Sequence, residues 1–202
     1  MSDLPVALRA DLALTLMNAI DREAKIARGL ESLGPIAGRD VLLVDAEHSP
    51  IGAGLVALGA RLTHAPLPNP LRFAAPAASV DVVVGLWSAF RGIDAAELAE
   101  VDRVLRPEGR LLVVHDYGRD DVSRILGDRP EPTAWSRRNG PFLSGGFRVR
   151  VIHAWWDFDS VEVATAFLRD AFGEPGAALG ATLKRPRLSY KVAIYHRSRP
   201  AA

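Results

Sequence analysis

The sequence predicts an α/β fold built on a mostly parallel sheet. Three segments rich in Val and Leu, at 41–44, 80–86 and 110–115, are typical of buried strands, and segments with helical spacing separate them. Parallel neighbours need a crossover connection, which is usually a helix, so this alternation favours a parallel sheet with helices on its faces. The chain of 202 residues is long enough for one domain with a sizeable core.

The first part of the chain contains the predicted parallel strands. Apolar residues recur at helical spacing before Gly34-Pro35, which ends one leading helix or two, and four prolines between 66 and 76 exclude a helix there. Asp94 is the expected N-cap of the helix that precedes the third of these strands. The predicted elements are, in order, a helical segment at 4–33, a strand at 41–44, a helix at 52–59, a strand at 61–65, a loop at 67–78, a strand at 80–86, a helix at 94–105 and a strand at 110–115.

The last third of the chain is expected to form the far edge of the same sheet as strand, helix and strand. Residues 147–158 alternate with period two, Asp159 and Glu162 form a capping-box pattern for a helix that ends at Gly173, and 188–196 is the last strand. One domain is expected over 1–202. Its parts are an N-terminal helical segment at 1–38, a parallel core at 39–116, a loop or lid region at 117–146 and the closing unit at 147–198.

Composition excludes several classes of protein. Twenty-five basic and 24 acidic side chains give a net charge of +1, which is too balanced for a nucleic-acid or membrane partner of the chain as a whole. No cysteine is present, so disulfides and thiol chemistry are excluded. No apolar run is long enough to span a bilayer, and acids interrupt the N-terminal apolar stretch, so a cytoplasmic protein is expected. Basic residues gather near the C-terminus, with six and no acid between Lys184 and Arg199, either as a solvated edge strand or as a contact for phosphate.

Two segments are similar to those of the class I S-adenosylmethionine (SAM)-dependent methyltransferases. Residues 79–84, Ser-Val-Asp-Val-Val-Val, resemble the fourth-strand segment of that family, and residues 100–114 resemble its helix, Pro-Gly turn and fifth strand. The resemblance extends over about residues 20–198. It implies a Rossmann-like sheet, methyl transfer from SAM and a small-molecule or macromolecular methyl acceptor.

The resemblance places the cofactor after the strands at 41–44 and 80–86. The residues that it assigns to cofactor binding are Asp45, Ala46, Glu47, Ser49, Leu86 and Trp87. The family has a glycine-rich loop after its first strand, where the backbone turns tightly against the cofactor. In this sequence Asp45, Glu47 and Ser49 stand at the three glycine positions.

Two further departures from the family concern the second and third strands. The family ends its second strand in an acid that binds the ribose hydroxyls, whereas residues 62–66 contain no acid. Only some fifteen residues separate that strand from Asp81, and a βαβ unit needs about 30. The third strand and its helix are therefore expected to be absent.

Candidate catalytic residues follow the strand at 110–115, since sites of open α/β sheets lie at the carboxyl ends of strands. His115, Asp116 and Tyr117 would supply a general base and a substrate contact. Asp120 and Asp121 are better explained as the start of a helix. The residues that would bind substrate or an anion are Arg119, Trp135, Arg137 and Arg138, the last three in a predicted lid loop in which Trp135 would otherwise pack on the core.

Two functions remain open from the sequence. One is a diverged methyltransferase that uses SAM in a remodelled pocket. The other is a non-catalytic protein of the same fold, a pseudoenzyme, that binds a protein partner, a second copy of itself or nucleic acid through the basic C-terminal strand. His48 and His115 would approach each other at the strand ends, but no ligand spacing predicts a metal site.

Overall fold

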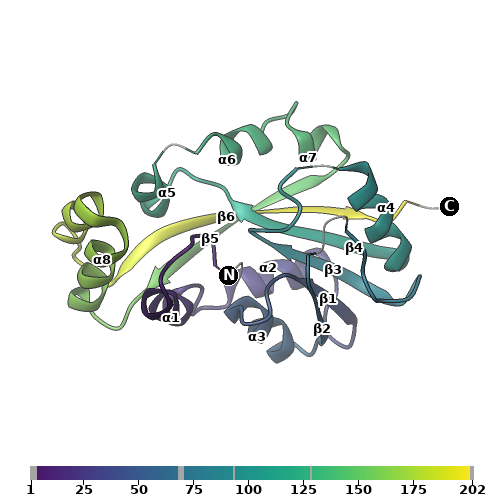
Figure 1. Cartoon of the computed structure of the whole chain (residues 1–202), viewed down its shortest axis with the longest axis horizontal. Coiled ribbons are helices and arrows are strands. Elements are labelled where there is room, and N and C mark those ends of the chain that lie inside the picture. Colours follow the sequence, from purple (N-terminus) through teal and green to yellow (C-terminus); the bar gives the residue numbers. More distant parts are fainter. Residues whose placement is uncertain (1–3, 68–70, 93, 128, 201–202) are drawn as a thin grey trace.

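The computed structural model describes residues 4–67, 71–92, 94–127 and 129–200 and contains a six-stranded sheet with helices on both faces (Figure 1). The strand order is β2-β1-β3-β4-β6-β5. The pairs from β2 to β4 are parallel, and β6 is antiparallel to both of its neighbours. The strands are β1 (Asp40–Val44), β2 (Arg61–Ala65), β3 (Val80–Leu86), β4 (Leu105–Asp116), β5 (Arg148–Asp157) and β6 (Arg187–Ser198). This architecture confirms the fold class that the sequence predicts.

Helices cover both faces of the sheet and enclose two apolar cores. Figure 1 shows α1, α2 and α3 below the sheet and α4, α6 and α7 above it. Successive strand residues point to opposite faces of the sheet. Leu43 therefore joins the core between the sheet and α1–α3, and Leu42 joins the core between the sheet and α4, α6 and α7. The helices are α1 (Ala10–Ala19), α2 (Lys25–Leu33), α3 (Pro50–Ala57), α4 (Ala95–Val104), α5 (Asp121–Leu126), α6 (Pro130–Trp135), α7 (Pro141–Ser144) and α8 (Val161–Gly180).

The parallel side of the sheet ends at β2, as expected from the short connection to β3. Residues 66–67 and 71–79 contain no helix or strand, and residues 68–70 lie outside the described part of the chain. Buried Glu100 of α4 holds this connection, because its carboxylate accepts a hydrogen bond from Phe73 N at 2.8 Å and from two Arg103 nitrogens. Arg103 also donates to the carbonyl oxygens of Phe73 and Ala75, each at 3.0 Å. The ion pair of Glu100 and Arg103 therefore fixes the connection between β2 and β3, which contains no helix or strand in its described residues.

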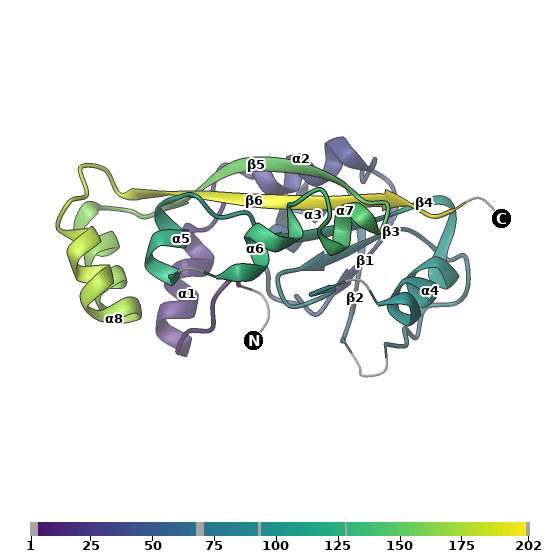
Figure 2. The same cartoon turned by 90° about the horizontal axis from the view of Figure 1, so that it is seen from above.

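The antiparallel side differs from the sequence prediction in two respects. The basic strand β6 is not an edge strand, because it lies between β4 and β5, and β5 is the edge. The N-cap of α8 is Ser160 and not Asp159, since the Ser160 hydroxyl accepts the hydrogen bond from Val163 N at 3.2 Å. Figure 2 shows the long β5–β6 pair running along the molecule with α8 at one end.

The helix α8 also continues beyond its predicted end. Gly173 has a φ of 61° and kinks the chain, but the residues after it, including Pro175, form a second helical part that reaches Gly180. A Cβ at Gly176 would lie 2.0 Å from the carbonyl oxygen of Leu168, so the two parts pack too closely for any other residue there. The predicted helix end at Gly173 is therefore wrong: the helix breaks there but continues to Gly180.

None of the described helices is both long enough and apolar enough to cross a bilayer.

Candidate functional site

The carboxyl ends of β1 and β3 lie side by side, because the strands are parallel neighbours with Val44 opposite Gly85. In open α/β sheets ligands bind at this edge. The backbone bends sharply after both strands, since Asp45 has a φ of 54° and Trp87 a φ of 32°. Aspartate is tolerated at positive φ better than most residues, whereas a bulky side chain there is an outlier. Both turns thus adopt a conformation that favours glycine, although neither contains one.

A hollow of about 460 Å³ opens at this edge, and we call it the crevice hollow. Residues 4–7 form one of its walls, and Asp45, Trp87, Ser88 and Arg91 complete its lining. The guanidinium group of Arg91 lies 5.4 Å from the centre of the Trp135 ring and 3.3 Å from a Glu131 carboxylate oxygen. The lining of the crevice hollow therefore includes both the carboxylate of Asp45 and the guanidinium group of Arg91.

The predicted cofactor residues separate into three groups. Asp45 and Trp87 line the crevice hollow. Ala46 and Leu86 belong to the buried core, and Ser49 is the buried N-cap of α3, with its hydroxyl accepting a hydrogen bond from Ile51 N at 3.2 Å. Glu47 is exposed on the loop after β1.

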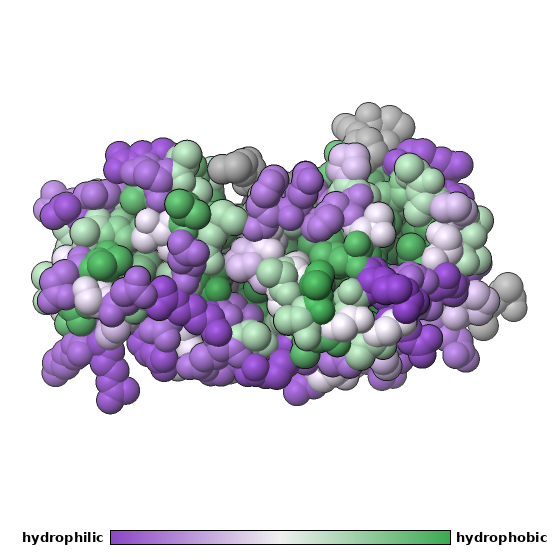
Figure 3. All heavy atoms as spheres, turned by 90° about the horizontal axis from the view of Figure 1, so that it is seen from below, coloured by the Kyte–Doolittle hydropathy of each residue, from purple (hydrophilic) through white to green (hydrophobic). Residues whose placement is uncertain are grey.

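His48 and His115 are not brought together, contrary to the expectation from the sequence. His48 lines an apolar hollow of about 380 Å³ between the N-terminal segment and α1. Figure 3 shows the underside of the molecule, on which α1 and α3 lie, with apolar patches among hydrophilic side chains. Leu14 of α1 and Val56 of α3 are exposed. His115 packs on the opposite face of the sheet.

His115 is buried in an aromatic cluster above β4. Its ring centre lies 4.5 Å from that of Trp135 and 5.8 Å from that of Phe142, and Nε2 is 3.0 Å from the carbonyl oxygen of Phe90. Burial lowers the pKa of His115 to about 4. The imidazole is therefore neutral at neutral pH, and its surroundings are those of a packed core residue.

The lowered pKa of His115 predicts a loss of stability in acid. Unfolded His115 has a pKa near 6.5, so the unfolded chain binds the proton first, and stability is lost as the pH falls from 6.5 through about 4. The loss amounts to about 3 kcal/mol when the lower pKa is reached. In His115→Phe this contribution should be absent. Urea denaturation of both proteins between pH 4 and 7 measures the difference, and parallel pH profiles would contradict the burial of a neutral imidazole.

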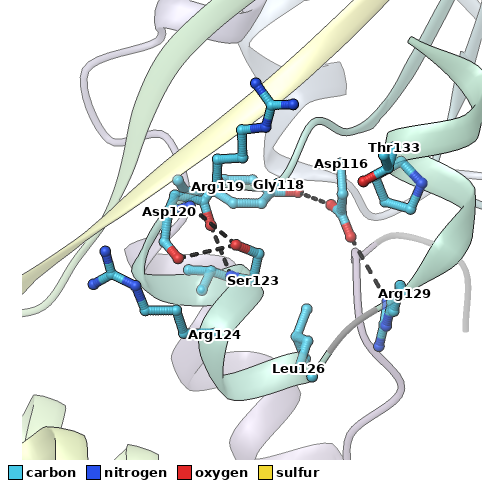
Figure 4. A pocket seen from close by; sticks show the side chains of 13 residues that line it. Asp116, Gly118, Arg119, Asp120, Ser123, Arg124, Leu126, Arg129 and Thr133 are labelled. Carbon is cyan, nitrogen blue, oxygen red and sulfur yellow. Dashed lines mark hydrogen bonds and ion pairs between the residues drawn. The ribbon is translucent and has the colours of Figure 1, made fainter. Parts of the chain in front are cut away.

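Asp116, the next residue of β4, points to the other face and lines a pocket of about 240 Å³, which we call the Asp116 pocket. Figure 4 shows Asp116 and Arg129 directed towards each other, while Arg119 and Arg124 extend away. The Asp116 carboxylate accepts a hydrogen bond from the Tyr190 hydroxyl at 2.5 Å and lies 3.7 Å from the Arg129 guanidinium. Burial raises the pKa of Asp116 to about 6, and the Tyr190 hydrogen bond opposes that rise. The carboxyl group therefore titrates close to neutral pH.

A line of hydrogen bonds joins the crevice hollow to the Asp116 pocket. Trp87 Nε1 donates to the Tyr190 hydroxyl at 2.8 Å, and that hydroxyl donates to Asp116. Tyr190 is fully buried, and burial raises its pKa well above the usual value, so the hydroxyl keeps its proton. Tyr190 is absent from the sequence-based candidates, although a tyrosine on the apolar face of a predicted strand needs a buried hydrogen-bond partner.

Of the other candidates after β4, Arg119 and Asp120 line the Asp116 pocket, and Tyr117 does not. Tyr117 is half-buried against the opposite core, and Arg119 is exposed with a φ of 61°. Asp120 caps α5 by accepting a hydrogen bond from Ser123 N at 2.7 Å, and Asp121 accepts from Ser189 N at 2.9 Å, which agrees with their interpretation as a helix start.

The predicted lid loop is packed on the sheet as α6 and α7. Trp135 ends α6 and is buried in the aromatic cluster, so it packs on the core, one of the two alternatives that the sequence left open. Arg137 and Arg138 are exposed on the turn between the two helices. In the part of the chain that the structure describes, no group of three His, Asp or Glu side chains is placed to hold a metal ion.

No protein-family model and no curated protein sequence matches the chain. Solved structures do match. A candidate type II methyltransferase from Anaeromyxobacter dehalogenans is 17% identical over 89% of this chain and 97% of its own, with a TM-score of 0.55. A SAM-dependent methyltransferase from Aquifex aeolicus is 14% identical over 95% of this chain and 98% of its own, with a TM-score of 0.53. At such identities the likeness concerns the fold. Together with the strand order, it shows that the chain has the fold of the class I SAM-dependent methyltransferases.

Proposed function

We propose that the protein is a methyltransferase that binds SAM in the crevice hollow and a small acceptor in the Asp116 pocket. The observation that carries the proposal is the hydrogen-bonded line from Trp87 through Tyr190 to Asp116. It connects two neighbouring hollows at the carboxyl edge of the sheet, where an α/β fold places its ligands. Methyl transfer needs two ligands held next to each other in a fixed orientation.

The charges of the crevice hollow fit one end of the cofactor. The methionine part of SAM carries an ammonium and a carboxylate group, and Asp45 and Arg91 offer the opposite charge to each. The ribose end fits less well, because no acid is present between Arg61 and Leu67 at the end of β2. SAM would supply an activated methyl group, and the adenosine part would have to be held by contacts other than those of the family.

The side chain of Asp116 would act as the general base for the acceptor. With a pKa of about 6 it is mostly ionised at neutral pH, and it would take the proton of an acceptor hydroxyl or amine as the methyl group is transferred. Tyr190 would hold the carboxylate in place, and Arg129 would contact an anionic group of the acceptor.

Loss of transfer in Asp116→Asn tests this function. The purified protein is incubated with methyl-labelled SAM and a small-molecule extract, and label in the extract is measured. We expect transfer to fall at least about 100-fold, a common size for the loss of a general base. Asp170→Asn, an exposed change on α8, is the matched control. Equal transfer by Asp116→Asn and the wild type would reject the assigned role.

A non-catalytic protein of the same fold is the second candidate. One observation favours it: Trp87 is only 4% exposed and fills the end of β3 beside the crevice hollow. If the indole occupies the space that the cofactor needs, SAM would not bind to the wild type. Trp87→Ala would then allow SAM binding only if the rest of the cofactor site were intact.

A further inference from the structure

We propose that the face of the sheet at the amino ends of its parallel strands binds the phosphate backbone of a nucleic acid. The residues that carry this inference are Arg110, Arg148 and Arg150, which we call the arginine face. Arg110 and Asp116 occupy opposite ends of the same stretch of β4, about 20 Å apart at the rise of a strand, so this surface is independent of the proposed methyl transfer.

The strand register places these side chains on one surface. Arg148 of β5 pairs with His196 of β6, and Arg150 pairs with Ile194. His196 pairs with Leu112 of β4, and Arg110 lies two residues before Leu112 on the same face. Arg148 and Arg150 are exposed on the edge strand, about 6.6 Å apart along it.

Among the residues that the structure describes, these arginines lack an acidic partner, unlike the paired arginines of β6. Arg187 pairs with Asp157 at 2.8 Å, and Arg197 pairs with Asp102 at 2.7 Å. For the arginine face the described part of the chain shows no ion pair, and Arg150 donates to the Ser32 hydroxyl at 3.0 Å. Burial and the three neighbouring arginines lower the pKa of His196. Like charges gathered in this way destabilise the free protein, so an anionic partner would offset their repulsion.

A hollow of about 520 Å³ extends the arginine face towards the amino ends of β3 and β4. Arg39, Arg110 and Arg199 line it, together with the acids Asp81 and Glu108. Asp81 is already paired with Arg106 at 2.9 Å. The positive charge therefore continues from the edge strand into the hollow.

The shape of this surface favours an extended polyanion over a single phosphate. The arginines are spread over β5, β4 and the lining of the hollow. The described residues lining the hollow include no aromatic side chain on which a base would stack. The contact would therefore be made to the backbone, with little sequence preference and a strong dependence on salt.

This surface differs from the one that the sequence leaves open for nucleic acid, which is the basic C-terminal strand. None of the arginine-face residues belongs to the basic strand β6, and Arg187 and Arg197 of that strand are paired with acids. Arg137 and Arg138 follow α6, which packs on the opposite face of the sheet.

The test compares two double variants with the same change of charge. Fluorescence anisotropy measures binding of labelled oligo-dT and of a short DNA duplex over a range of NaCl concentrations. We expect Arg148→Glu/Arg150→Glu to weaken binding at least tenfold and to reduce the slope of log K against log[salt] by about 1.5 to 2, one unit or slightly less per lost phosphate contact. Arg9→Glu/Arg169→Glu, at the N-cap of α1 and on α8, should bind within twofold of the wild type.

A second variant separates loss of binding from loss of folding. Arg148→Gln/Arg150→Gln should raise the melting temperature, because repulsion is relieved, and still weaken oligonucleotide binding. Equal losses in both charge-reversal variants, or no binding of either nucleic acid by the wild type at 50 mM NaCl, would overturn the proposal. So would tighter binding to phosphatidylserine vesicles than to the oligonucleotides.

Discussion

Tyr190→Phe is expected to destabilise the protein by about 3 kcal/mol. The hydroxyl accepts from Trp87 Nε1 and donates to Asp116, and Trp87 and Tyr190 are buried while Asp116 is partly buried. Its removal leaves an indole N–H and a carboxylate without this partner, and each buried unpaired group costs about 1–3 kcal/mol. Loss of the hydrogen bond that opposes burial should also raise the pKa of Asp116 above about 6. Urea denaturation measures the first effect, and NMR titration of the labelled carboxyl group measures the second.

Tyr195→Phe is the matched control, because Tyr195 lies on the same strand and is equally buried. In the described part of the chain its hydroxyl has no hydrogen-bond partner. Removing it should change stability by less than about 0.5 kcal/mol or increase it, since a buried unpaired hydroxyl is itself unfavourable. If both variants lose the same stability, the line from Trp87 to Asp116 is not formed as described.

Glu100→Ala is expected to cost about 3 kcal/mol and to release the connection between β2 and β3. The carboxylate binds Phe73 N, Arg103 and Arg72, so its loss leaves two guanidinium groups and a backbone amide without their partner. The hydrogen bond from Arg103 lowers the pKa of Glu100 to about 2, so its contribution is present above pH 4.5 and lost as the pH falls through about 2. Denaturation at pH 7 and limited proteolysis of the connection measure the two consequences.

Glu97→Ala is the control on the same helix. Glu97 is half-buried in the first turn of α4, and burial raises its pKa. Within the described residues, no hydrogen bond or ion pair joins Glu97 to the connection between β2 and β3. We therefore expect the free energy of unfolding to change by at most about 0.5 kcal/mol. Unchanged protease sensitivity of residues 71–79 in Glu100→Ala would show that the ion pair does not hold this segment.

The parallel half of the fold could be predicted from the sequence because local patterns determine it. Val41–Val44 and Val80–Leu86 are apolar runs that only a doubly covered strand accommodates, and Asp94 marks the start of α4 by accepting hydrogen bonds from Ala96 N and Glu97 N. The proline-rich connection is too short for another βαβ unit, which correctly predicts β2 as the last strand on that side.

The antiparallel half depends on contacts between residues far apart in the sequence. Whether β6 or β5 is the edge depends on which strand pairs with β4, and no local pattern specifies this choice. The same is true of the site. Asp116 and His115 are adjacent and equally polar in the sequence, but alternation along β4 sends one to a pocket and the other into an aromatic core. Tyr190 reaches Asp116 from 74 residues away.

The N-terminal segment is a further part of the site that the sequence does not reveal. Residues 4–7 form a wall of the crevice hollow and separate it from the apolar hollow beside His48. Asp45, at a position where the sequence resemblance implies a glycine, has a positive φ of 54°. The turn after β1 therefore combines a carboxylate in the crevice hollow with a sharply bent backbone.

Calorimetric titration with SAM and with S-adenosylhomocysteine tests the central claim most directly. The account predicts micromolar binding of both ligands to the wild type and at least tenfold weaker binding to Arg91→Glu, because that change reverses the charge expected to meet the methionine carboxylate. Arg169→Glu, on the far helix α8, should bind like the wild type. Absence of heat at millimolar ligand, in a protein that unfolds cooperatively, would contradict the proposed methyltransferase and leave a non-catalytic protein with the methyltransferase fold.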